Sequence, residues 1–211
     1  MHSILETLKN RYPDLHGCIS DIEQSYHILR DAFASGNKLL VCGNGGSASD
    51  SDHIVGELMK GFERKRLISP DMREKLIQQN LEVGTYLAEK LQGALPAIAL
   101  TTQSALISAI SNDVASDMIF AQQVYGYGQA GDVLLGISTS GNSGNVINAI
   151  HVAKICGLKT IGLTGKMGGK MGELCDLTIC VPYDTTARIQ ERHLPVYHAL
   201  CTLLEQEFFD A

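Results

Sequence analysis

The feature that most constrains the fold of this chain is a repeated unit: a short apolar run, a turn of small residues, then a helical pattern. Five such runs occur, at residues 38–42, 96–100, 132–138, 159–164 and 177–182. Each run is continuously apolar, as in "KLLVC" and "DVLLGIS", which is typical of strands buried on both faces of a parallel sheet. With helices between the strands, the sequence predicts a three-layer α/β/α sandwich with a five-stranded parallel sheet, formed as a single domain over residues 1–211.

Two segments lie outside this repeat. Residues 1–36 show helical spacing and predict N-terminal helices, which Pro13 divides. Residues 61–93 separate the first helix of the repeat from the second strand. In "SPDMREKL", Ser69 suits a helix N-cap and Pro70 the first helical position, so we expect one inserted helix over about 70–92. It would cover the sheet edge, the functional site or a partner subunit.

Composition narrows the functional classes. The formal net charge is −6, which argues against a nucleic-acid or anionic-membrane partner. An anionic small molecule stays possible, because backbone N–H groups can bind a phosphate without charged side chains. The six cysteines are scattered without a C-x-x-C pair, which favours reduced thiols in a cytoplasmic protein over a disulfide framework.

Two glycine-rich turns follow strands, at the sheet edge where parallel α/β folds bind ligands. The second, "STSGNSG" at 138–144, offers four hydroxyl groups ahead of a helix that starts near Ser143. These residues predict a phosphate-binding loop: Ser138, Thr139, Ser140 and Ser143. The alternative is a serine-rich helix cap that needs no ligand, although one cap requires only one hydroxyl group.

The first turn, "GNGGSA" at 43–48, also matches the pattern G-x-G-x-x-A of dinucleotide-binding proteins. The acidic residue at the required distance, Glu63, lies in a charged run rather than at a strand end. The spacing of "GLTGKMGGK" does not match a P-loop. We therefore expect no nucleotide and no redox cofactor.

A set of potential metal ligands and acid–base groups lies on two predicted helices. His53 and Glu57 are four residues apart and share one helical face. Gln190 and His198 are two turns, or about 12 Å, apart on the last helix and would share an ion only by leaning together. Two imidazoles, a carboxylate and an amide suit Zn²⁺, and the same groups can move protons. His193 faces elsewhere, and Pro195 leaves the local geometry open.

Several ordered motifs carry a family resemblance: "GNGGSASDSDHIVGEL", "AISND", "GDVLLGISTSGNSGNVINAI", "GLTGKMGGKMGELCDLTICVP" and "TARIQERH". The chain resembles the sugar-isomerase (SIS) domain family, and within it the phosphoheptose isomerases, from about residue 35 onward apart from 61–93. The resemblance implies a flavodoxin-like sandwich and a homotetramer with active sites between subunits. It also implies isomerisation of sedoheptulose 7-phosphate to D-glycero-D-manno-heptose 7-phosphate, through an enediol.

The resemblance also implies roles for individual residues. It assigns the phosphate to the second glycine-rich turn, and it assigns substrate contacts to Asn44, Gly45, Gly46, Glu57, Asn112, Asp113 and Gln190. It implies a zinc site made of His53, Glu57, Gln190 and His198. Within that site, Glu57 and His198 match the acid–base pair.

The chain departs from the family pattern at three places: the longer inserted segment, "NDVASDMIF" in place of the aromatic-and-glycine stretch common after Asn-Asp, and the more acidic "SDSDH". Two alternatives to an enzyme remain open: a non-catalytic SIS protein that binds a partner such as a replication initiator, and a regulator that binds a sugar phosphate. The presence of both Glu57 and His198 favours an enzyme, and we expect no DNA-binding domain.

Overall fold

A computed structural model describes residues 2–209 and contains a five-stranded sheet in which all paired strands are parallel. The strand order is β2-β1-β3-β4-β5. The strands are β1 (Leu39–Gly43), β2 (Ala97–Ala99), β3 (Val133–Ser138), β4 (Lys159–Thr164) and β5 (Leu177–Cys180). The predicted fold class is confirmed, and each strand lies within or beside its predicted apolar run.

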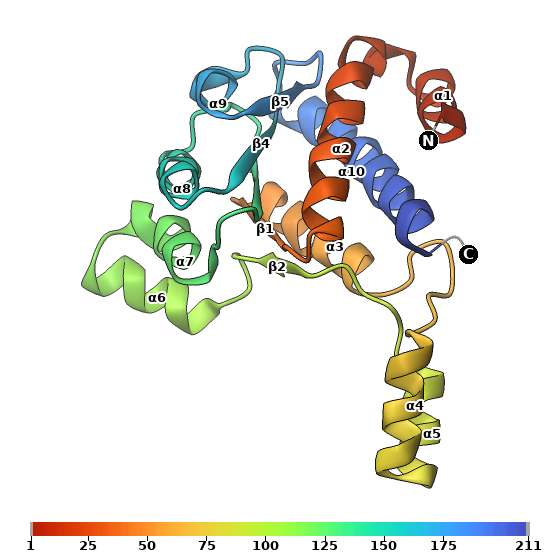
Figure 1. Ribbon diagram of the computed structural model, residues 1–211. Coiled ribbons are helices and arrows are strands. Elements are labelled where there is room, and N and C mark those ends of the chain that lie inside the picture. Colours follow the sequence, from red (N-terminus) through yellow and green to blue (C-terminus); the bar gives the residue numbers. More distant parts are fainter. Residues whose placement is uncertain (1, 210–211) are drawn as a thin grey trace.

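Helices cover both faces of the sheet (Figure 1). Along β1, Leu39 and Val41 pack in the cluster that includes α2 (Ile19–Ala34), α3 (Gly46–Met59) and α10 (Thr186–Phe209). Leu40 and Cys42 point to the opposite face and pack with α7 (Ile119–Tyr127) and α8 (Gly144–Ile155). The two-residue period of a strand therefore divides one continuous apolar run between two cores.

Five further helical segments complete the body of the domain within the described residues. Pro13 begins a short 3₁₀ helix between α1 and α2, so the predicted division of the N-terminal helices is confirmed. The bounds of these five helical segments are α1 (His2–Arg11), η1 (Pro13–Cys18), α6 (Ser104–Asp113), η2 (Ser116–Met118) and α9 (Gly169–Leu174). Helix α10 continues through Pro195 without interruption.

The inserted segment is two helices rather than one, so the prediction of a single helix over 70–92 is wrong. Helix α4 (Pro70–Gln79) begins at Ser69, whose hydroxyl group accepts the Met72 N–H at 3.2 Å as expected. Asn80 then adopts an extended backbone and caps α5 (Leu81–Lys90), accepting the Val83 N–H at 2.9 Å. The two helices form a hairpin that projects from the body of the domain (Figure 1).

A glycine allows the two helices of this hairpin to pack closely. A Cβ atom on Gly84 would lie 2.0 Å from the carbonyl oxygen of Leu76.

Two further findings concern the whole described chain. All six cysteines are free thiols, and burial raises the pKa of Cys18 to about 11. Between residues 2 and 209, no helix combines the length and the apolar character needed to cross a membrane.

Candidate functional site

The candidate site is built on two helices, α3 and α10, that pack alongside each other. Gly46 at the start of α3 lies beside Gln190 near the start of α10. About two turns later on α3, His53 contacts Tyr197 and His198 of α10. Contacts therefore advance in the same direction on both helices, so the two helices run parallel and the site extends along their shared length.

A pocket of about 280 Å³ lies at the start of these helices, where β1 and β3 end. Both glycine-rich turns contribute to it, as does the first part of α10. Its lining residues are Asn44, Gly45, Gly46, Ser47, Ile137, Ser138, Thr139, Ser143, Thr186 and Gln190. None of them is charged, yet the N-termini of α3 and α8 both open at this pocket, which favours an anion.

Local geometry explains why glycines occupy the first turn and how this turn is held in place. Gly45 adopts a φ of 57° at the N-cap of α3, a left-handed conformation that favours glycine. A Cβ atom on Gly46 would lie 2.4 Å from the amide nitrogen of Gln190, so the absence of a side chain allows Gln190 to reach the pocket. Beside the pocket, the side chains of Asn44 and Asn145 exchange hydrogen bonds of 2.9 Å and join the first turn to the start of α8.

The hydroxyl groups of the second turn are clustered rather than used as helix caps. Ser143 is the N-cap residue of α8, but its side chain makes no capping hydrogen bond. Its Oγ lies 2.9 Å from Oγ of Ser138, which lies 3.5 Å from Oγ of Ser140. This arrangement disfavours the serine-rich cap and leaves the hydroxyl groups available to an anion. Thr139 lines the pocket, whereas Ser140 lines an adjoining hollow.

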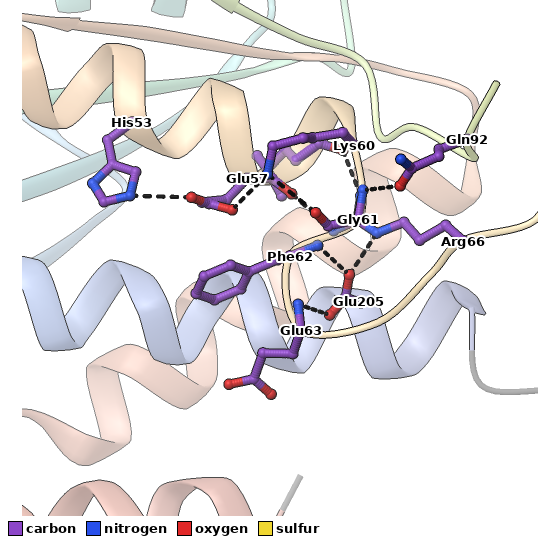
Figure 2. Close-up of polar contacts among 10 residues, drawn as sticks. His53, Glu57, Lys60, Gly61, Phe62, Glu63, Arg66, Gln92 and Glu205 are labelled. Atoms are coloured by element: carbon purple, nitrogen blue, oxygen red, sulfur yellow. Dashed lines mark hydrogen bonds and ion pairs between the residues drawn. The ribbon is translucent and has the colours of Figure 1, made fainter. Parts of the chain in front are cut away.

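The potential acid–base groups meet further along the same helices. His53 Nε2 lies 3.1 Å from Glu57 Oε1, and Lys60 Nζ lies 3.4 Å from Glu57 Oε2 (Figure 2). The Glu57 side chain is only 13% exposed. The rings of His53 and His198 lie 5.0 Å apart, edge to face. His53 therefore lies between Glu57 on its own helix and His198 on α10.

His198 is suited to accept a proton. Its Nε2 atom is buried and has no hydrogen-bond partner. Burial lowers the pKa of His198, as does the neighbouring His53, and these effects outweigh the opposite effect of Glu57. The neutral imidazole is therefore favoured at neutral pH. A cavity of about 360 Å³ adjoins His198 and is lined by α1, α10 and Phe62.

Two residues of this cluster were not predicted from the sequence. Tyr197 Oη lies 3.0 Å from His53 Nδ1 and donates to Asp50 Oδ1 at 3.2 Å. Burial raises the pKa of both Asp50 and Tyr197. Asp50, His53 and Glu57 recur at intervals of three and four on α3, so helical spacing was a usable signal for Asp50. Nothing in the sequence pairs Tyr197 with His53.

The other predicted residues lie apart from this cluster. Gln190 lines the pocket at the start of α3 and α10 and makes no hydrogen bond to His53, Glu57 or His198. Asn112 and Asp113 lie exposed at the end of α6, where Asn112 Nδ2 donates to Asp113 Oδ1 at 2.7 Å. Neither residue lines the phosphate pocket or the cavity at His198. His193, expected to be structural, is fully buried.

The donor types fit zinc, because two imidazoles and a carboxylate lie together and the unpaired Nε2 of His198 is free to ligate. Within residues 2–209, however, no three His, Cys, Asp or Glu side chains converge closely enough to hold an ion. The cluster is therefore a candidate ligand set whose members would have to turn toward a common point.

This chain is similar to known proteins over most of its length. The family profile of the SIS domain matches residues 14–91 and 83–165. The phosphoheptose isomerase of Aliarcobacter butzleri is 43% identical over 186 residues, or 88% of this chain and 85% of the relative. That of Akkermansia muciniphila is 37% identical over 202 residues, or 96% and 93%.

Solved structures are also similar to this chain over most of its length. The phosphoheptose isomerase of Neisseria gonorrhoeae aligns with a TM-score of 0.74 and 33% identity, covering 95% of this chain and 94% of that chain. The phosphoheptose isomerase of Francisella tularensis aligns with a TM-score of 0.77 and 32% identity, covering 97% and 96%.

Proposed function

Because this chain belongs to the SIS domain family and, within it, to the phosphoheptose isomerases, we propose that it isomerises sedoheptulose 7-phosphate to D-glycero-D-manno-heptose 7-phosphate. The observation that carries the proposal is that α3 and α10 bear both kinds of group that the reaction requires. One end of the helix pair presents an uncharged pocket suited to a phosphate. Further along the pair are a carboxylate and two imidazoles suited to proton transfer.

Each group has a defined part in the reaction. Glu57 takes the proton from the carbon beside the carbonyl group and returns it to the neighbouring carbon, which interconverts ketose and aldose through an enediol. His198, favoured as neutral imidazole, exchanges a proton with the substrate oxygens. His53 and Lys60 approach the two carboxylate oxygens of Glu57 and orient it. The substrate and product have the same oxidation state, so the reaction needs no redox cofactor.

The phosphate group anchors the substrate in the other part of the site. Hydroxyl groups of Ser138, Thr139 and Ser143 and the N-termini of α3 and α8 would hold the dianion without a charged side chain. We place Ser140 at the rim of this cradle, with Asn44, Gly45, Gly46 and Gln190 on the sugar side. Asn112 and Asp113 remain predicted substrate contacts on the evidence of the resemblance.

We propose Zn²⁺ as the cofactor, held by His53, Glu57, His198 and Gln190. When bound, it would supply polarisation of the substrate oxygens. Support for the ligand set comes from the unpaired Nε2 of His198 and its position beside His53.

We further propose a homotetramer in which a neighbouring copy completes each site. Gly46 and Glu57 are eleven residues apart on α3, or about 16 Å along the helix axis. This separation favours a site in which one copy holds the phosphate group and another supplies the acid–base pair. The free thiols favour the cytoplasm as its location.

The non-catalytic alternatives are less favoured, because the named relatives are isomerases and the chain retains both Glu57 and His198. Turnover of a panel of C5 to C7 ketose phosphates, with zinc measured on the same sample, tests the proposal. We expect sedoheptulose 7-phosphate to be the best substrate. An absence of turnover with every member of the panel in a zinc-loaded sample would refute it.

A further inference from the structure

A buried ion pair contacts the backbone of Glu57, and the proposed reaction does not use it. Arg66 Nε donates to Glu205 Oε1 at 2.7 Å, and the two side chains are 0% and 1% exposed. Arg66 is in the loop after α3, and Glu205 is in the last turns of α10 (Figure 2). The pair therefore joins the two site-bearing helices at the end where the acid–base cluster lies.

The guanidinium group of Arg66 holds the C-terminal end of α3. Its Nη2 donates to the carbonyl oxygen of Glu57 at 2.8 Å, and its Nη1 donates to that of Leu58 at 2.6 Å. The last carbonyl groups of a helix have no partner within the helix, and a cation there also complements the helix dipole. Arg66 thus fixes the backbone of Glu57 through a directional hydrogen bond.

Glu205 holds the loop in the same way. Its two oxygens accept the N–H groups of Phe62 at 2.8 Å and Glu63 at 2.9 Å. Burial alone would raise the pKa of Glu205, but these two hydrogen bonds and Arg66 outweigh burial and lower it. The Phe62 ring in turn lies 5.2 Å from the ring of His198. One carboxylate therefore sets the loop that packs against the second acid–base residue.

We propose that Arg66 and Glu205 are positioning residues, which set the separation of Glu57 and His198 needed for proton transfer. The inference rests on the proposed function. Arg66 acts on Glu57 through its backbone carbonyl, and Glu205 acts on His198 through Phe62. Neither residue touches the substrate.

The chemistry of the pair supports positioning rather than stability. A buried ion pair adds little net stability compared with well-packed apolar side chains, because both charges lose their hydration. An apolar pair could fill this space, but it could not donate to two carbonyl groups and accept two N–H groups. The hydrogen bonds of this pair are therefore directional restraints on the segments next to Glu57 and His198.

The test is Glu205→Gln in the full-length, zinc-loaded protein, with Asp132→Asn as the matched control. Asp132 is also buried, pairs with Lys38 Nζ at 2.6 Å and accepts the N–H groups of Lys38 and Gln129. It immediately precedes β3, and its hydrogen bonds go to Lys38 and Gln129 rather than to the segments next to Glu57 and His198. Both variants remove one buried charge from a hydrogen-bonded pair, so both should lower the unfolding temperature.

Only Glu205→Gln should lower kcat with sedoheptulose 7-phosphate, by about 10- to 100-fold, because a displacement near 1 Å has effects of this size. KM should change less than about twofold, since the phosphate pocket lies at the other end of α3. Arg66→Lys keeps the positive charge but loses the planar fork, so we expect a similar loss of kcat. If Glu205→Gln does not fold, Arg66→Lys is measured in its place.

The proposal fails if a folded Glu205→Gln or Arg66→Lys protein retains the kcat of the wild type, or if Asp132→Asn loses kcat equally. A wild-type protein that turns over no ketose phosphate would instead refute the proposed function, and with it any role for this pair in positioning. Turnover by the wild type with unchanged kcat in the variants would refute the positioning role alone.

Discussion

Replacement of Glu57 by glutamine should abolish most turnover and leave phosphate binding intact. The amide has nearly the same size and can still contact His53 and Lys60, which now approach the carboxylate at 3.1 and 3.4 Å. It cannot act as a base. A positioned general base contributes about 10²- to 10⁴-fold in rate, or about 3 to 5 kcal/mol of transition-state stabilisation, so kcat should fall by that factor.

Binding should survive because the phosphate pocket begins at Gly46, about 16 Å earlier along α3. The assay pairs steady-state kinetics with calorimetric titration of sedoheptulose 7-phosphate into the variant. Glu89→Gln makes the same chemical change at an exposed position on α5 and should leave both measurements unchanged. Near-normal turnover in Glu57→Gln would show that Glu57 is not the base. Loss of both turnover and binding would show that its role is to hold the site together.

Three further predictions concern binding, acid stability and metal. Ser138→Ala and Ser143→Ala should each weaken binding of inorganic phosphate by about tenfold, the effect of one lost hydrogen bond to a charged group; unchanged calorimetric affinity in both would mean that the phosphate binds elsewhere. Burial lowers the pKa of His193 from 6.5 to about 4, so the unfolded chain takes up a proton first as the pH falls. The free energy of unfolding should therefore decrease by about 3 kcal/mol in total as the pH falls from 6.5 to 4. Urea titrations of His193→Gln should not show this decrease. His53→Ala should lose zinc on dialysis, because three ligands cannot complete the coordination shell; stoichiometric zinc by mass spectrometry would refute the proposed ligand set.

Much of the fold followed from local patterns. The five apolar runs predicted the strands because a parallel strand buried on both faces leaves a continuous apolar signature that does not depend on distant residues. The two glycine-rich turns were recognisable for a related reason, since their position after a strand already places them at the ligand-binding edge. His53 and Glu57 were linked by helical spacing alone.

What the sequence could not predict depends on contacts between distant residues. The ion pair of Arg66 and Glu205 joins residues 139 positions apart, and no local pattern marks a charged side chain as buried. Gln190 and His198 contact different parts of α3 because the helices run in parallel, and their spacing on one helix could not show which part each would meet. The break at Asn80 was missed because the start signals at Ser69 and Pro70 do not show where the helix ends.

The α4–α5 hairpin leaves and re-enters the domain at a single point. The Gly93 N–H donates to the Arg66 carbonyl oxygen at 3.1 Å, and the Gly61 N–H donates to the Gln92 side chain at 2.8 Å. When the ends of a segment are held together, each doubling of its length costs only about 0.6 kcal/mol in closure entropy. The hairpin can therefore be replaced by another segment whose ends lie equally close together. Chains of this family can differ in its length with little penalty to the sheet, and residues 68–91 offer a graft site for a foreign helical pair or a reporter domain.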